Sequence, residues 1–267
     1  MDFSITLLNF ATTDIVIIMD EKNLTKKEKL QLSFEFMQRT MVHYAMWYVQ
    51  VREEFGLERA AEIMDEAWQK SFYIQMKRLA KVLDFELEDG LPKPLLELEE
   101  TKIDQLREAV AVNWLANDGV WFQSVEFSEG MFPAKACNDA AWGQFSPYEA
   151  LRIKKMLGLA EYPGIEGLKR AMELRLYATV NVQSFANETE KSIEFYMNNC
   201  RVQAARKRKG LDDYPCKSGG IIEYSTFAAT IDSRIKTKVI GCPPDKHPDE
   251  WYCGWKFYID EENRTVE

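Results

Sequence analysis

The first two thirds of the chain carry apolar side chains at intervals of three and four residues, which is the period of a helix that buries one face. One run with this spacing consists of Phe36, Thr40, His43, Tyr44, Trp47 and Val51. Part of the pattern occurs twice, because residues 46–83 match residues 120–157 at a constant offset of 74 positions, with ten identities. Each copy is therefore expected to form one supersecondary unit.

Turn signals divide each copy into short helices. Gly56 and Gly130 occupy the same place in the two copies, and a glycine there can take the left-handed conformation that ends a helix. A second helix is expected at residues 58–69 and 132–143. In the second copy, the Ser-Pro-Tyr-Glu segment at residues 146–149 has the form of a further helix start, with its serine as the cap. We therefore predict about three helices in each copy.

In the last third of the chain the pattern changes to alternation of apolar and polar residues, which is the period of a strand. Residues 173–184 and 191–197 should form an antiparallel hairpin, and residues 234–241 and 254–258 two further strands. A helix is expected at about residues 201–209, where it would connect the hairpin to the later strands.

Together these patterns predict an α+β protein. Its helical region, residues 1–160, would contain two related units at about residues 24–83 and 105–157. Its second domain, residues 161–267, would be a cysteine-rich, small antiparallel or mixed sheet with crossover helices.

Composition and charge limit the partners of the chain. The formal net charge of −9 opposes binding to the phosphate backbone of nucleic acids.

Residues 3–19 are apolar, but they lack the positive start of a signal peptide and are too short to span a membrane comfortably. We expect them to be core or interface, and such a patch favours a homo-oligomer. Without an export signal, and with an odd number of cysteines, the protein is expected to be cytoplasmic with reduced thiols.

Four of the five cysteines fall in about the last quarter of the chain, together with one of the two histidines. They are Cys200, Cys216, Cys242 and Cys253, with His247 between the last two. Strands that end near residues 199 and 241 would be parallel if they share a sheet, so Cys200 and Cys242 would follow them at one edge. Cys253 would begin the strand that returns from this edge. The sequence therefore predicts that these side chains converge, although their spacing matches no standard zinc motif.

Three roles for the converging cysteines remain open. A metal site with the four cysteines and His247 as ligands would suit zinc or iron. A nucleophilic thiolate needs a cation or a helix end that lowers its pKa, and Cys200, beside Arg201 at a predicted helix start, meets this need best. Burial of the cysteines as small apolar side chains would require neither role.

Further site residues are proposed on local grounds. Asp118 would act as a base if it is buried, and His247, on a loop flanked by prolines, would move a proton. A charged helix face and a solvated loop explain these two residues equally well. The candidates for contact with a substrate are Arg201, Arg206, Trp121 and His43. The alternatives are core positions for Trp121 and His43, and interaction of the arginines with a helix dipole.

Several segments carry a family resemblance. The stretch from Cys200 to Leu211, with Pro215-Cys216-Lys217, Glu223-Tyr224 and Cys242-Pro243-Pro244-Asp245, resembles a family of bacterial and archaeal cytosolic proteins. More distantly it resembles the L-2-amino-thiazoline-4-carboxylic acid hydrolase-like proteins. Residues 118–123 and 145–150 are similar to the helical part of the same family. The resemblance covers about residues 105–260 and implies a helical region joined to a small α+β domain whose cysteines mark the site. It also implies hydrolytic opening of a small ring that contains nitrogen and sulfur.

The sequence thus predicts an enzyme that hydrolyses a C–N or C–S bond in a small polar molecule. A thiolate, or water activated by a metal, would attack the substrate. The alternative is a non-catalytic module that binds a metal or a small effector and uses its helices as a surface for a partner.

Overall fold

The N-terminal helix α1 (Lys26–Phe55) begins at a capping box. Thr25 Oγ1 accepts a hydrogen bond from the Glu28 N–H at 3.3 Å, and the Thr25 N–H donates to Glu28 Oε2 at 2.8 Å. The helix ends at Gly56, whose φ of 80° favours glycine. In the computed structural model, which describes residues 22–208, 210 and 213–259, this helix belongs to the first of two units, which ends at Gly56. The predicted core or interface segment at residues 3–19 lies outside the described residues.

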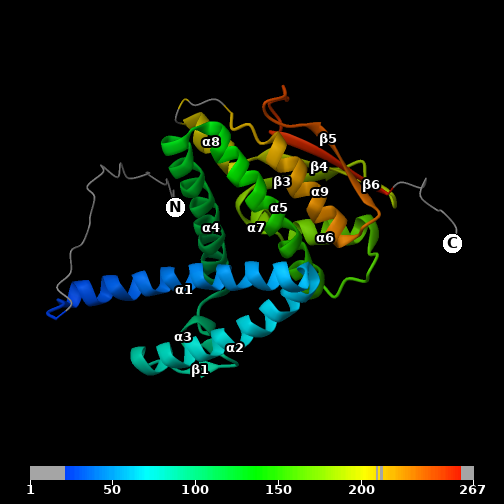
Figure 1. The fold of residues 1–267 in the computed structure, drawn as a ribbon. Helices are drawn as coiled ribbons and strands as arrows, with labels where there is room; N and C mark the ends of the chain where they lie inside the picture. The colour runs from blue at the N-terminus through cyan, green and yellow to red at the C-terminus, as the bar shows by residue number, and fades with distance from the viewer. Residues whose placement is uncertain (1–21, 209, 211–212, 260–267) are drawn as a thin grey trace. The chain divides into compact units, whose positions relative to one another are not determined.

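Residues 57–267 form the second compact unit, whose first half is helical (Figure 1). Its long helices are α2 (Leu57–Leu83), α4 (Glu100–Glu129) and α5 (Met131–Met156). Between α2 and α4 lie β1 (Leu87–Glu88), β2 (Leu91–Pro92) and the short α3 (Lys93–Leu96). The helices α4 and α5 pack against each other, and the turn between them is Gly130, with a φ of 96°.

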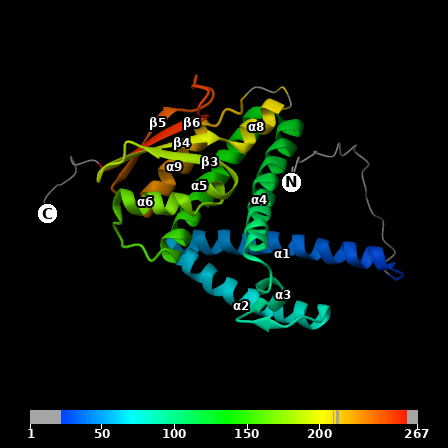
Figure 2. The ribbon, with the colours of Figure 1, turned by 180° about the vertical axis from the view of Figure 1, so that it is seen from behind.

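The second half of this unit is built on a four-stranded antiparallel sheet with the order β3-β4-β6-β5 (Figure 2). The strands are β3 (Val182–Ala186), β4 (Ser192–Asn199), β5 (Ile235–Gly241) and β6 (Cys253–Ile259). The accompanying helices are α6 (Gly164–Glu173), α7 (Leu176–Val180), α8 (Arg201–Arg208) and α9 (Lys217–Ile231). Helix α9 packs against both α5 and β5. The predicted α+β class is therefore confirmed.

The predicted helix start at residues 146–149 is wrong, because α5 continues through Pro147 without a break. Ser146 is buried, and its hydroxyl donates a 2.6 Å hydrogen bond to the Glu223 carbonyl of α9 instead of capping a new helix. The second copy of the repeat consequently has two long helices, α4 and α5, where three were expected. Contact with α9 outweighs the local cost of a proline in a helix interior.

The predicted hairpin is right in its second strand and mostly wrong in its first. Residues 176–180 form α7, and β3 begins only at Val182. The Leu176 N–H donates to Glu149 Oε1 of α5 at 3.2 Å, so a carboxylate from a distant helix satisfies one of the free N–H groups at the start of α7. The alternation of apolar and polar residues at 173–184 predicts a strand and contains no sign of the partner Glu149.

The hydrophobic core lies between the sheet and its helices. Phe195, Phe227, Trp255 and Phe257 are each at most 1% exposed. The helix α5 contributes Ala150 and Ile153 to the same core, so the boundary predicted near residue 160 falls inside the second unit.

The repeated tryptophans do not share one environment. Trp142 is 6% exposed and stacks on Tyr177 at 5.4 Å between ring centroids. Trp68 is 48% exposed, and Trp121 is 67% exposed, so the alternative of a core position for Trp121 is wrong. The part of the chain that the structure describes contains no helix long and apolar enough to cross a membrane.

Candidate functional site

The sheet brings three of the cysteines to one edge, as the sequence predicted. Strands β4 and β5 run in the same direction because each is antiparallel to β6, which lies between them. Cys200 follows the end of β4, Cys242 follows the end of β5, and Cys253 is the first residue of β6. All three pack in or against the main hydrophobic core.

Cys216 joins them from the loop that precedes α9. The Lys217 N–H donates to the Pro243 carbonyl at 2.9 Å, which ties the residue after Cys216 to the residue after Cys242. Cys216 is half-buried against the same core as the other three. We call Cys200, Cys216, Cys242 and Cys253 the thiol cluster.

Two members of the thiol cluster are held in the protonated form. Burial, together with the neighbouring Cys216, raises the pKa of the Cys200 thiol to about 12, although backbone N–H groups at the start of α8 act to lower it. Interactions with the Cys216 and Cys253 side chains, and burial, raise the pKa of Cys242 far above its usual value. The expectation that a helix start would make Cys200 a thiolate is therefore wrong, because burial outweighs the helix end.

Cys216 has a different environment, set by the buried side chain of Gln203. Gln203 Nε2 donates to Cys216 Sγ at 3.1 Å and to the Tyr214 carbonyl at 2.9 Å, and Gln203 Oε1 accepts from the Tyr214 N–H at 2.8 Å. Cys216 is also the N-cap residue of the fifteen-residue helix α9. An amide donor and the positive end of a helix dipole thus both act on the Cys216 sulfur.

The structure does not group the predicted metal ligands around one point in the part of the chain that it describes. Among the described residues, no three His, Cys, Asp or Glu side chains are placed so that they hold a metal ion. His247 pairs with Asp213, at 3.2 Å between Nε2 and Oδ2, and its Nδ1 lies 2.8 Å from the Pro248 carbonyl oxygen. Burial lowers the pKa of His247, but these two hydrogen bonds outweigh it and raise the pKa. Zinc or iron ligation therefore stays a prediction from the sequence.

One face of α4 places a carboxylate between two tyrosines near the thiol cluster. Trp114, Asp118 and Phe122 are four residues apart, so they lie on the same side of the helix. The Trp114 and Tyr177 rings are in contact, with 5.1 Å between their centroids, and so are the Phe122 and Tyr214 rings, with 4.9 Å between their centroids. Asp118 therefore lies between the two tyrosine contacts.

Asp118 and the two tyrosines are all removed from solvent, which raises the pKa of each. Burial raises the pKa of Asp118, and in the described part of the chain its carboxylate has no hydrogen bond or ion pair. Burial raises the pKa of Tyr214, and the charges of Cys216 and Asp118 add to the shift. Burial also raises the pKa of Tyr177, with contributions from Glu223, Asp118 and Cys200. Each tyrosine therefore lies near Asp118 and near one member of the thiol cluster.

A buried arginine lies behind this face. Arg175 is 2% exposed, and its Nε donates to Glu149 Oε2 at 2.9 Å. Its Nη2 lies 2.7 Å from Glu223 Oε1, in an ion pair that lacks the alignment of a hydrogen bond. Burial disfavours the charged form of Arg175, but the two glutamates prevail and raise its pKa. Burial raises the pKa of Glu223 to about 7 even with Arg175 beside it.

The residues predicted to contact a substrate lie in different places. The Arg201 N–H donates to Asn181 Oδ1 at 2.8 Å, and its guanidinium lies 4.0 Å from Glu108. The charge of Arg206 acts on Tyr214 and lowers its pKa, against the larger effect of burial. Trp121 lies on an exposed side of α4, and His43 belongs to α1 in the first unit. Of this set, Arg201 and Arg206 on α8 are nearest to the thiol cluster in the chain.

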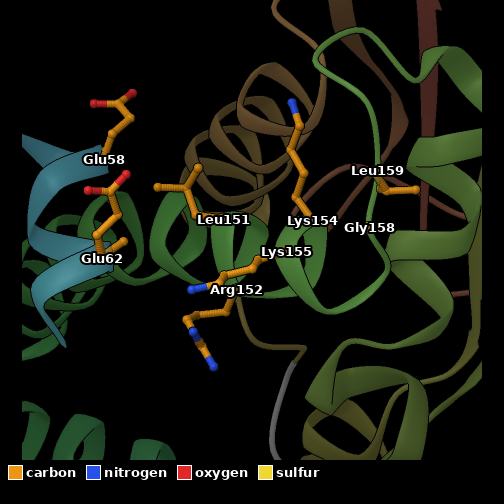
Figure 3. Close-up of a pocket in the computed structure, with 9 residues that line it drawn as sticks. Glu58, Glu62, Leu151, Arg152, Lys154, Lys155, Gly158 and Leu159 are labelled. Atoms are coloured by element: carbon orange, nitrogen blue, oxygen red, sulfur yellow. The ribbon is translucent and has the colours of Figure 1, made fainter. Parts of the chain in front are cut away.

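A separate pocket of about 310 Å³ lies between α2 and α5 (Figure 3). Its wall carries acidic side chains from α2 and basic side chains from α5. Asp65 engages two of these bases, Arg152 at 2.5 Å and Lys155. None of the residues predicted as site residues lines this pocket, and two of its basic side chains, Arg152 and Lys155, pair with Asp65 of α2.

Sequence reasoning missed several residues of the site. Tyr177, Tyr214 and Arg175 were not predicted as site residues, and Gln203 and Glu223 entered only as part of the family resemblance. The spacing of Trp114, Asp118 and Phe122 is a signal that could have marked the α4 face. No local spacing reveals the role of Gln203, because its partners Tyr214 and Cys216 are more than ten residues away.

Comparison with known proteins identifies a family but no characterised relative. The model of a family of unknown function, DUF6125, matches residues 22–102 and 96–259. The two matches begin 74 residues apart, which is the offset of the internal repeat. No curated protein and no solved structure matches the chain. The resemblance to the thiazoline hydrolase-like proteins therefore stays a prediction.

Proposed function

The chain belongs to the DUF6125 family, whose function is unknown, and we propose from its site that it is an enzyme that hydrolyses a C–N or C–S bond in a small polar molecule. One observation carries the proposal. Asp118 is a half-buried carboxylate without a partner among the described residues, and it lies on the face of α4 whose Phe122 contacts Tyr214. The Tyr214 carbonyl accepts a hydrogen bond at 3.3 Å from the thiol of Cys216, which lies at a helix N-terminus. Covalent hydrolysis requires a nucleophile and an acid–base group close together in a site from which water is largely excluded.

Cys216 is the proposed nucleophile in place of Cys200 or Cys242. Burial keeps Cys200 in the thiol form, and hydrogen bonds to Cys216 and Cys253, together with burial, do the same for Cys242. Cys216 is instead half-buried at the N-terminus of α9, where its sulfur accepts a hydrogen bond from the Gln203 amide at 3.1 Å and donates one to the Tyr214 carbonyl at 3.3 Å. The Cys216 thiol would add to the electrophilic carbon of the substrate while its proton passes to Asp118. Asp118 would return this proton to the nitrogen or sulfur that leaves, and water would then release the acyl-type intermediate and restore the thiol.

The first test uses 2-amino-thiazoline-4-carboxylate as the substrate, because of the family resemblance, with the ring-opened product measured by mass spectrometry. We expect Cys216→Ser to abolish turnover and Asp118→Asn to lower kcat by about 10² to 10⁴. Cys137→Ser is the matched control, since Cys137 is the exposed cysteine outside the cluster. Full turnover by Cys216→Ser would exclude Cys216 as the nucleophile.

A second readout does not depend on the choice of substrate. Iodoacetamide should modify Cys216 faster than Cys200 and Cys242, because the thiolate is the reacting form. Peptide mass spectrometry after brief labelling gives the three rates separately. Faster labelling of Cys200 would contradict the assignment even if no substrate is known.

A second candidate function is a binding module with a helical partner surface. Phe127 is 80% exposed and Phe132 is 87% exposed, on either side of the turn between α4 and α5. Large apolar side chains in such positions mark interaction surfaces in other proteins. This reading predicts that Phe127→Ser weakens association with a partner while labelling of Cys216 is unchanged.

A further inference from the structure

Cys242 and Cys253 face each other at the edge of the sheet where β5 ends and β6 begins. Beyond a bulge in β5, the strand register pairs Gly241 with Gly254. The next residues in each direction are Cys242 and Cys253. Directly opposed residues of antiparallel strands have Cα atoms about 4.5 to 5.5 Å apart, which is within the span of a disulfide.

The two thiols differ in exposure in a way that suits stepwise oxidation. Cys253 is half-buried and therefore open to a small oxidant, whereas Cys242 is fully buried beside it. Both are free thiols, and their side chains interact with each other. The backbone around Cys253 is fixed from the other side as well, because Cys253 pairs with Met197 of β4. The pair is therefore held together before any oxidant arrives.

We propose that Cys242 and Cys253 form a site of reversible oxidation, at which a peroxide converts the two thiols into a cross-strand disulfide. The Cys253 sulfur attacks one oxygen of the peroxide, the O–O bond breaks, and a sulfenic acid and one water result. The Cys242 sulfur then attacks the Cys253 sulfur. The S–O bond breaks, the hydroxide that leaves takes the Cys242 proton, and a second water forms. One peroxide is reduced by two electrons, and the two thiols are oxidised by two.

The disulfide would also change the surroundings of Cys216. Cys242 interacts with Cys216 as a thiol, and this interaction is lost when its sulfur is bonded to Cys253. We expect hydrolytic turnover to fall on oxidation and to return with dithiothreitol. This consequence rests on the proposed function, whereas the cross-link itself does not.

The test is peptide mapping of the full chain after treatment with hydrogen peroxide. Free thiols are blocked with N-ethylmaleimide, and the protein is digested with trypsin without reduction. Cleavage after Lys238, Lys246 and Lys256 places Cys242 and Cys253 in separate peptides, so their disulfide appears as one linked species. We expect this species to dominate in oxidised protein and to disappear after dithiothreitol.

Two variants keep the assignment open to refutation. Cys253→Ser should give no linked species containing Cys242, whereas Cys216→Ser should form the Cys242–Cys253 species within about twofold of the wild-type rate. A dominant link between Cys216 and Cys242 in the wild-type protein would overturn the assignment. So would labelling of all four cluster thiols after peroxide. The mapping needs no variant to fold and no substrate, so its failure is separate from failure of the proposed hydrolysis.

Discussion

Glu223 shows how opposing effects set the ionisation of one residue. Burial raises its pKa from 4.5 to about 7. The nearby charge of Arg175 lowers the pKa, but by less than burial raises it. In the unfolded chain the same carboxyl ionises near its usual pKa. Between these two values the folded protein therefore binds more protons than the unfolded chain, and stability must fall as the pH rises.

We expect the free energy of unfolding of the wild type, relative to Glu223→Gln, to decrease as the pH rises from about 4.5 to about 7, by at most about 3 kcal/mol. The physical reason is that ionising a buried carboxyl costs free energy only in the folded state. Urea denaturation across this pH range measures the difference. Glu166→Gln, the same substitution at an exposed position of α6, should show no such dependence. If the free energy of unfolding of the wild type, relative to that of Glu223→Gln, increased with pH, the raised pKa of Glu223 would be contradicted.

At the scale of elements, a single buried carboxylate of α2 pairs with two cations of α5. Asp65 of α2 binds Lys155 and Arg152 of α5. The hydrogen bond from Lys155 lowers the pKa of Asp65, and the charge of Arg152 adds to this effect. Burial acts in the opposite direction but does not reverse it. The Asp65 carboxylate therefore contributes fully to stability when the pH is above the pKa that Asp65 has in the unfolded chain. This contribution is lost as the pH falls through the lower pKa of Asp65 in the folded protein. Asp139, the counterpart of Asp65 in the repeat, instead pairs with Lys135 within its own helix.

Asp65→Asn should lower the free energy of unfolding at pH 7 by about 1 to 2 kcal/mol, because two cations of α5 lose their charged partner. The measurement is urea denaturation followed by circular dichroism. Glu62→Gln on the same helix is the control, since its pair with Arg59 is exposed and should contribute less than about 0.5 kcal/mol. Equal losses in the two variants would show that Asp65 does not hold α2 on α5.

The helices also show where local signals reach their limit. Gly56 and Gly130 end α1 and α4, as their positions in the repeat predicted, because a positive φ is a local property of glycine. The Ser-Pro-Tyr-Glu segment was misinterpreted because Ser146 finds its partner 77 residues away, in α9.

At the scale of the whole molecule, the thiol cluster, the α4 face and the sheet all lie in the second compact unit. Its core includes Leu168, Phe195, Phe227 and Trp255, none of which comes from the first unit. A unit that contains its own core is expected to fold alone.

A chain of residues 57–267 should therefore unfold in one cooperative transition. Its pattern of cysteine labelling should stay within about twofold of the full chain, because the core residues that pack with the cluster all lie in this unit. Denaturation and peptide mapping measure the two properties, with a chain of residues 22–267 as the control. A gradual transition in the shorter chain alone would show that α1 is required for folding.

The sequence by itself determined the two periodicities, the internal repeat and the sheet edge at which Cys200, Cys242 and Cys253 follow or begin strands. These are local or nearest-neighbour properties of the chain, so spacing reveals them. Only the tertiary structure decided which groups ionise and which helix ends are satisfied. Burial overrides the helix start at Cys200, Gln203 reaches Cys216, and Arg175 joins Glu149 to Glu223. Those effects depend on desolvation and on partners far away in sequence, which no local pattern contains.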